Sequence, residues 1–193
     1  MRMKWKCEVR KIQYTDLFSE EIKHEHSRLV SRIAGLIAKN ALFSRDEVTL
    51  IESAAILHDV GKNFIPKPLL LKKSKLTAHE YKIMQSHTLA GATQILQTIR
   101  TLLAAYIIAL QHHERVDGTG YAGMTNIHPY AKVVAVADVF DSLLAKRPYK
   151  QAWPPEKAVF YMQENIHKQF EASYVTALIE SIDEILDLYE GGL

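Results

Sequence analysis

A single cysteine, Cys7, occurs among the 193 residues, so no disulfide can form within the chain. Long apolar segments are also lacking, because the longest run, residues 102–110, is about half as long as a bilayer-spanning helix. The charged N-terminus has no apolar stretch after it, which excludes a signal peptide. From these absences we expect a cytoplasmic protein without a membrane partner.

An excess of one charge is missing too, since the formal net charge is only +2. Such a chain offers no strong field for a nucleic-acid polymer or an acidic membrane. Hydrophobic residues make up 48% and charged residues 24%, which is typical of a globular protein. The length suits one domain. We expect residues 19–193 to form this domain and residues 1–18 to be a short N-terminal extension.

Apolar residues recur every three or four positions through most of the chain, which predicts amphipathic helices. Capping boxes at residues 44–47 and 77–80 predict helices that run to His58 and to Ile95. Residues 131–145 also predict a helix, with a strand as the alternative because of the valines. The whole pattern predicts an all-α fold, a single bundle of about seven to eight helices.

Several polar side chains fall on the predicted buried faces of five helices. They are His26, His58, Asp59, His87, His112, His113 and Asp138. One histidine on an apolar face is usually a satisfied core residue, but burial of the whole set is costly unless something pairs with all of it. A metal centre does so, and imidazole and carboxylate groups suit iron, manganese or zinc. The set contains no thiolate, which argues against a structural zinc site.

This many ligands exceeds what one ion needs and fits two ions that share a carboxylate, as in two-metal hydrolases. Asp59 is the predicted bridge, because its neighbour His58 can hold one ion while Asp59 reaches both. Lys62 follows His58 by one turn, so its ammonium is expected to face an anionic oxygen, most simply a phosphate. The alternative for Lys62 is a surface ion pair.

Four motifs resemble the HD-GYP phosphodiesterases, a branch of the HD-domain metal-dependent phosphohydrolases. They are "HDVGK", "KLTAHEYKIMQSH", "HHERVDGTGY" and "VADVFDSLLAKRPYK", within a match from about residue 26 to residue 177. The resemblance implies a helical bundle that hydrolyses the bacterial second messenger cyclic di-GMP. It also implies two or three metal ions, often iron or manganese.

The resemblance further implies a role for individual residues. One metal would be held by His26, His58, Asp59 and Asp138, and the other by Asp59, His87, His112 and His113. The substrate's phosphates and guanines would contact Lys62, Tyr121, Arg147 and Lys150. Asp59 and Lys62 would be catalytic: a metal-bridging hydroxide attacks phosphorus in line and gives linear pGpG, with further hydrolysis to GMP left open.

The sequence departs from the family pattern at three points. Ile22 stands where the family's third metal needs a glutamate, so we expect two divalent ions. The signature Gly-Tyr-Pro ends in Ala122, and the loop after it is shorter than usual. These changes leave alternatives open: a phosphodiesterase for another cyclic dinucleotide such as cyclic GMP-AMP, or a weakly active or inactive module that binds a cyclic dinucleotide or a protein. A signalling protein partner or a homodimer also stays open.

Overall fold

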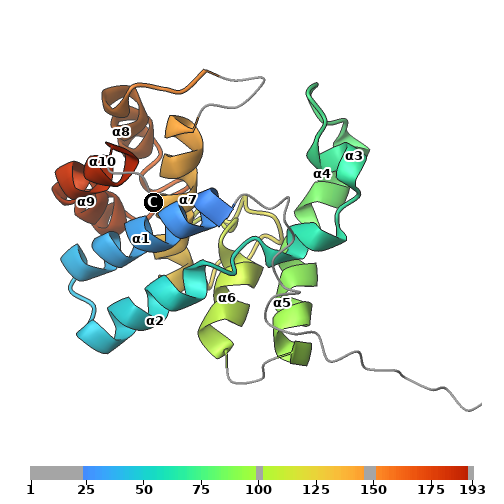
Figure 1. Cartoon of the computed structure of the whole chain (residues 1–193), viewed down its shortest axis with the longest axis horizontal. Helices are drawn as coiled ribbons and strands as arrows, with labels where there is room; N and C mark the ends of the chain where they lie inside the picture. Colours follow the sequence, from blue (N-terminus) through green and yellow to red (C-terminus); the bar gives the residue numbers. More distant parts are fainter. Residues whose placement is uncertain (1–23, 99–101, 146–150, 191–193) are drawn as a thin grey trace, which may run out of the picture.

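The computed structural model describes residues 24–98, 102–145 and 151–190 (Figure 1). These residues form a 3-10 helix, η2 (Val60–Phe64), and the helices α1 (His24–Asn40), α2 (Arg45–Ala55), α3 (Lys67–Leu70), α4 (Ala78–Gln85), α5 (His87–Thr98), α6 (Leu103–Gln111), α7 (Pro129–Leu144), α8 (Pro155–Glu164), α9 (Ala172–Glu180) and α10 (Ile182–Glu190). The predicted all-α fold is confirmed. The predicted domain boundary at residue 18, together with Ile22, Arg147 and Lys150, lies outside the described residues.

Helix α7 occupies the interior of the bundle. Its alanines and its valines other than the partly exposed Val139 are buried, as expected of a helix that other helices surround. Pro129 occupies the first turn, and the His128 side chain accepts a hydrogen bond from the backbone N–H of Tyr130, so the start is well defined. The strand alternative for this segment is therefore excluded.

Helices α2, α6, α8, α9 and α10 pack against α1 or α7. Helix α1 contacts α2, α7 and α9, whereas α5 packs against α6 and η2. Figure 1 shows α8, α9 and α10 at one side of the bundle and α3, α4 and α5 at the opposite side. Within the described ranges, no helix is both long and apolar enough to cross a membrane.

Two helices are shorter than predicted, and in both cases a histidine follows the end. The predicted capping boxes at Ser44 and Thr77 are present. However, α2 ends at Ala55, three residues before His58, and the helix expected over residues 77–95 is divided at Ser86. The Ser86 hydroxyl donates to the carbonyl of Ile83, which competes with the regular helical ladder.

The C-terminal helices are also interrupted. The sequence predicts helices over residues 155–167 and 174–189, but α8 ends at Glu164 and the last segment is divided into α9 and α10 at Ser181. The Ser181 hydroxyl donates to the carbonyl of Ala177 and accepts a hydrogen bond from the Asn40 side chain. This contact joins the start of α10 to the end of α1.

Helix α5 approaches η2 so closely that only glycine fits between them. A Cβ atom on Gly61 would lie 1.8 Å from the carbonyl oxygen of His87 and 2.5 Å from the nitrogen of Gly91. The position of Gly61 shortly after an apolar run predicts that it lets the chain turn away, but its φ is not in the left-handed region, which Gly118 and Gly123 adopt. The role of Gly61 is backbone contact, and this contact places His87 beside Asp59.

Candidate metal centre

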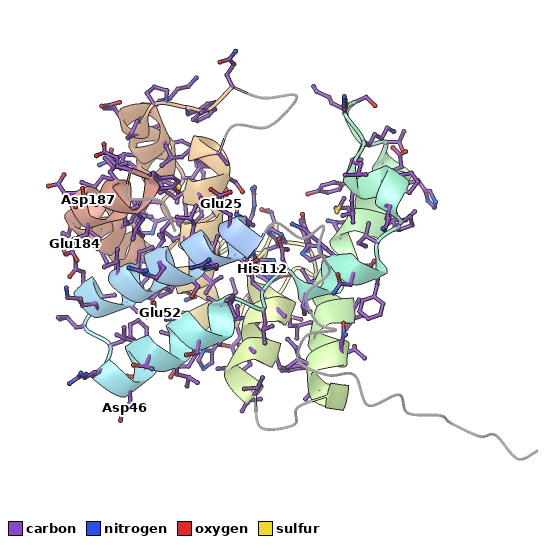
Figure 2. The ribbon with its side chains drawn as sticks, in the orientation of Figure 1. Glu25, Asp46, Glu52, His112, Glu184 and Asp187 are labelled. Carbon is purple, nitrogen blue, oxygen red and sulfur yellow. The ribbon has the colours of Figure 1, made fainter. Side chains whose placement is uncertain are left out.

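The histidines and aspartates predicted as ligands converge inside the bundle. Three groups have ligand atoms that all lie within 4.8 Å of one another. They are Asp59, His87, His112 and His113; His26, His58 and Asp59; and His58, His112 and Asp138. Figure 2 shows His112 in the interior, whereas the carboxylates of Asp46 and Asp187 point outward.

The two oxygens of Asp59 face different histidines. Oδ2 lies 3.8 Å from His26 Nε2 and 3.4 Å from His58 Nε2. Oδ1 lies 3.3 Å from His87 Nε2 and 3.7 Å from His112 Nε2. A carboxylate with one oxygen toward each set of nitrogens can serve as a ligand shared by two ions.

The Nδ1 atoms of three histidines lie within hydrogen-bond distance of carbonyl oxygens in the last turn of the helix that precedes each histidine. His58 Nδ1 is 2.8 Å from the oxygen of Ala55, and His87 Nδ1 is 2.7 Å from that of Met84. His112 Nδ1 is 3.1 Å from the oxygen of Ile108. Because a carbonyl only accepts, Nδ1 carries the proton and Nε2 is left with a lone pair directed into the cluster.

Two atoms of the cluster are buried without a partner. Among the described residues, neither His58 Nε2 nor Asp59 Oδ1 has a hydrogen-bond partner. Such groups are costly to bury unless a further species binds them. Since both atoms are good ligands for a divalent cation, the residues present fit a metal ion at this position.

The cluster also displaces the pKa values of its members. Burial opposes protonation of His26, but hydrogen bonds to Asp138 and Asp141 raise its pKa to about 10. Burial would raise the pKa of Asp59, yet chiefly the charge of Lys62 holds that pKa well below its usual range. Burial lowers the pKa of His87 to about 4. A bound cation would replace the proton on His26, so binding would release a proton.

Lys62 lies at the edge of the cluster. Its ammonium donates to Asp59 Oδ2, and its side chain is partly exposed. The ammonium therefore lies between solvent and the Asp59 carboxylate, where an incoming anion would meet it.

The comparisons with known proteins agree with this geometry. The family model described as an HD domain matches residues 15–173. The chain belongs to the HD-domain family. An HD domain binds divalent metal, and the cluster around Asp59 offers the ligands.

Two curated relatives and one solved structure show what the chain is similar to. The "cyclic di-GMP phosphodiesterase response regulator RpfG" of Xanthomonas campestris pv. campestris is 43% identical over 154 residues, 78% of this chain and 41% of the relative. The "3'3'-cGAMP-specific phosphodiesterase 3" of Vibrio cholerae is 34% identical over 167 residues, 85% of this chain and 36% of the relative. The chain thus spans less than half of each relative.

The solved structure titled "Bd1817, a HDG"Y"P protein from Bdellovibrio bacteriovorus" shares the fold. Its TM-score is 0.68 at 20% identity, over 89% of this chain and 55% of that one. The resemblance to the HD-GYP branch, first seen in the motifs, is confirmed by these comparisons.

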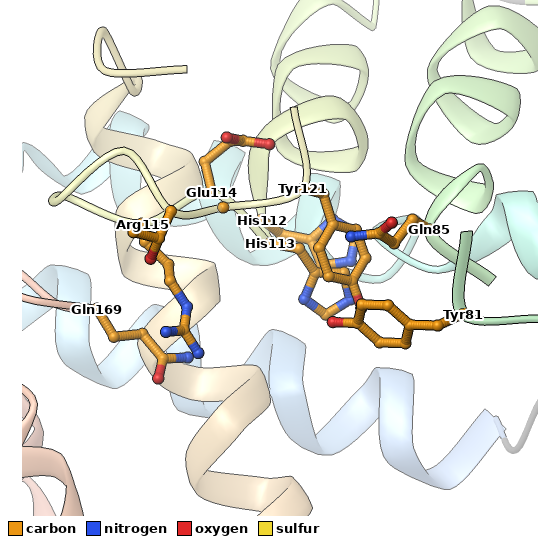
Figure 3. A pocket seen from close by; sticks show the side chains of 10 residues that line it. Tyr81, Gln85, His112, His113, Glu114, Arg115, Tyr121 and Gln169 are labelled. Carbon is orange, nitrogen blue, oxygen red and sulfur yellow. The ribbon is translucent and has the colours of Figure 1, made fainter. Parts of the chain in front are cut away.

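A cavity of about 470 Å³ opens beside His112 and His113 of this HD domain (Figure 3). Tyr121 forms part of its wall, with its ring centroid 4.5 Å from that of His113. Tyr81 of α4 meets Tyr121 edge to face at 5.9 Å. Arg115 also lines the cavity. The volume suits a small-molecule ligand, and the aromatic rings offer surfaces on which a base can stack.

Glu114 holds the loop that carries Tyr121. Its carboxylate is buried and accepts hydrogen bonds from the backbone N–H groups of Ala122 and Met124, each at 2.8 Å. Gly120 allows this approach, because a Cβ there would lie 2.5 Å from the Cα of Glu114. The residues that directly follow α6 therefore include both the His112–His113 pair and Glu114, which holds the Tyr121 loop.

Sequence reasoning did not find every residue that shapes the site. Glu114 adjoins the histidine pair, and its position in the motif could have drawn attention to it. Asp141 shares a face of α7 with Asp138, and that spacing was a usable signal. Tyr81 and Tyr189 carried no such signal, because their contacts depend on how separate helices meet.

Proposed function

We propose that this chain hydrolyses cyclic di-GMP to linear pGpG with two divalent ions, iron or manganese. The proposed ligands are His26, His58, Asp59, His87, His112, His113 and Asp138. The observation that carries the proposal is Asp59, whose two oxygens face separate sets of histidine nitrogens. The similarity to a cyclic di-GMP phosphodiesterase supports the choice of substrate.

The ions, when bound, would lower the pKa of a water molecule and neutralise charge on the phosphoryl oxygens. The protein would supply orientation. Asp59 would fix the spacing of the pair, and the Lys62 ammonium would stabilise negative charge that develops on phosphate. Tyr121 would stack against a guanine, while Arg147 and Lys150 are proposed to bind phosphate or guanine.

A second candidate substrate is cyclic GMP-AMP. It is favoured by the similarity to a 3'3'-cGAMP-specific phosphodiesterase. Both substrates contain two phosphodiesters and at least one guanine, so the same metal centre would serve either.

The proposal is tested with protein purified under anaerobic conditions and analysed for metal. We expect two ions per chain and cleavage of cyclic di-GMP to pGpG in the presence of Mn²⁺ or Fe²⁺. A parallel assay with cyclic GMP-AMP and cyclic di-AMP measures selectivity through kcat/KM. Tight binding of cyclic di-GMP without turnover under any metal would instead indicate a receptor.

Arg147→Ala is expected to raise KM for cyclic di-GMP about 10- to 100-fold, because a charge-assisted hydrogen bond is worth about 1.5–3 kcal/mol. Metal content should stay at the wild-type value. The matched control is Arg45→Ala, which removes an exposed arginine at the start of α2. Loss of metal from the Arg147 variant would show that this residue does not act on the substrate.

Glu114→Gln is expected to raise KM about tenfold and to leave the metal content unchanged. The amide keeps one acceptor, so its NH₂ group would face a backbone N–H of Ala122 or Met124, at a cost of about 1–3 kcal/mol. The Tyr121 loop would then lose its fixed position. Steady-state kinetics and metal analysis check this, with Glu180→Gln at an exposed position as the control. An unchanged KM would mean that the loop is held by other contacts.

A further inference from the structure

His26 is held differently from the other histidines of the cluster. His58, His87 and His112 direct Nδ1 to a carbonyl three or four residues earlier in their own segment. His26 Nδ1 instead lies 2.5 Å from Oδ2 of Asp141, a residue of α7 that is 115 positions away in the chain. Its orientation therefore depends on tertiary contact with a carboxylate.

Asp141 is in turn held by the last helix. Its carboxylate is 2% exposed, and its Oδ1 accepts a hydrogen bond of 2.8 Å from the hydroxyl of Tyr189 in α10. Burial, with the charge of Asp141, raises the pKa of Tyr189, so the hydroxyl stays a donor. The chain of contacts thus runs from α10 through α7 to α1.

Helix α10 is also anchored at its other end. The Asn40 side chain, at the end of α1, donates to Ser181, and Lys39 pairs with Glu184 at 3.7 Å. Both contacts lie on the helix that carries His26. Helix α10, which carries the Tyr189 hydroxyl, is therefore joined to α1 in two ways. Asn40 and Lys39 contact it directly, and Asp141 connects it to His26.

We propose that Asp141 and Tyr189 are positioning residues for His26, and that α10 thereby sets the affinity of one metal ion and not of the other. A carboxylate that accepts the second N–H of a metal-binding histidine fixes its ring and makes the ligand more basic. His87, His112 and His113 have no share in this arrangement, because their rings are oriented by other contacts. The inference rests on the proposed pair of ions.

The test is a titration of metal-free protein with Mn²⁺, in which free Mn²⁺ is followed by electron paramagnetic resonance. Wild-type protein should bind two ions. In Asp141→Asn one of the two affinities should fall about 10- to 100-fold, and in Tyr189→Phe about tenfold, while the other affinity stays unchanged. Should Asp141→Asn fail to fold, Tyr189→Phe decides, since it removes one oxygen and keeps the ring.

The matched control is Tyr161→Phe. The Tyr161 hydroxyl that this variant removes lies outside the cluster and donates to Gln169 Oε1 at 3.2 Å. It should leave both affinities unchanged. Equal weakening of both sites in Tyr189→Phe, or no weakening, would overturn the positioning role while the proposed function stands. Fewer than two bound ions in the wild-type protein would instead contradict the proposed function.

Discussion

Asp59→Ala is expected to lower the rate of cyclic di-GMP hydrolysis by about 10³-fold or more. Asp59 is the carboxylate that faces both sets of histidines, so its removal takes a ligand from each proposed ion. Metal-ion catalysis contributes several kcal/mol of charge stabilisation, and each 1.4 kcal/mol corresponds to a factor of ten in rate. The measurement is kcat/KM with Mn²⁺ in excess, together with the number of ions bound.

The control for this variant is Asp187→Asn, which changes an exposed carboxylate on α10 (Figure 2). It should keep both its metal and its activity. If kcat/KM of Asp59→Ala stays within tenfold of the wild-type value, Asp59 does not bridge the ions, whatever the metal content. Full metal content with no activity would instead show that Asp59 acts on the reaction and not on the ions.

Gly61→Ala is expected to destabilise the fold by about 3 kcal/mol, at the upper end of the usual cost of overpacking. The new methyl group would meet backbone atoms of His87 and Gly91, which cannot rotate away as a side chain would. For a chain of this size the melting temperature should fall by about 6–12 °C. Because η2 and α5 must separate, Asp59 and His87 should also lose their spacing, and metal affinity should fall.

Gly35→Ala provides the contrast. Gly35 lies inside α1, where a Cβ would meet the Glu52 carboxylate at 3.2 Å, at the end of a flexible side chain. Alanine favours a helix interior over glycine by about 0.5–1 kcal/mol, so this variant should melt at the same temperature as wild type or slightly higher. Calorimetry of the two variants checks the pair. If the two variants have the same melting temperature, the backbones of η2 and α5 can accommodate a methyl group at Gly61, contrary to the distances in the structure.

The sequence was sufficient to predict the fold class and to name the side chains that converge. Helical periodicity places His26 and Asp138 on buried faces, and a polar group at such a position stands out against apolar neighbours. The ends of helices were predicted less well, because Ser86 and Ser181 break the ladder through side-chain hydrogen bonds that compete with a local preference for helix.

Contacts between distant segments could not be predicted. The pairing of Asp141 with Tyr189 depends on the angle at which α10 crosses α7, and no local pattern specifies that angle. The same holds for Gly61, whose neighbour Gly91 is 30 positions away in the chain. Its sequence context suggested a turn, and only the packing of two backbones reveals the reason for glycine.

The hydrogen bonds from His58, His87 and His112 to backbone carbonyl oxygens bear on whether the ligands are oriented before or after metal binding. Each of these imidazoles presents Nε2 to the cluster once the end of the preceding helix has formed, so three of the seven proposed ligands are oriented before any ion binds. Binding of the proposed ions to these three histidines would then need no rearrangement of the backbone.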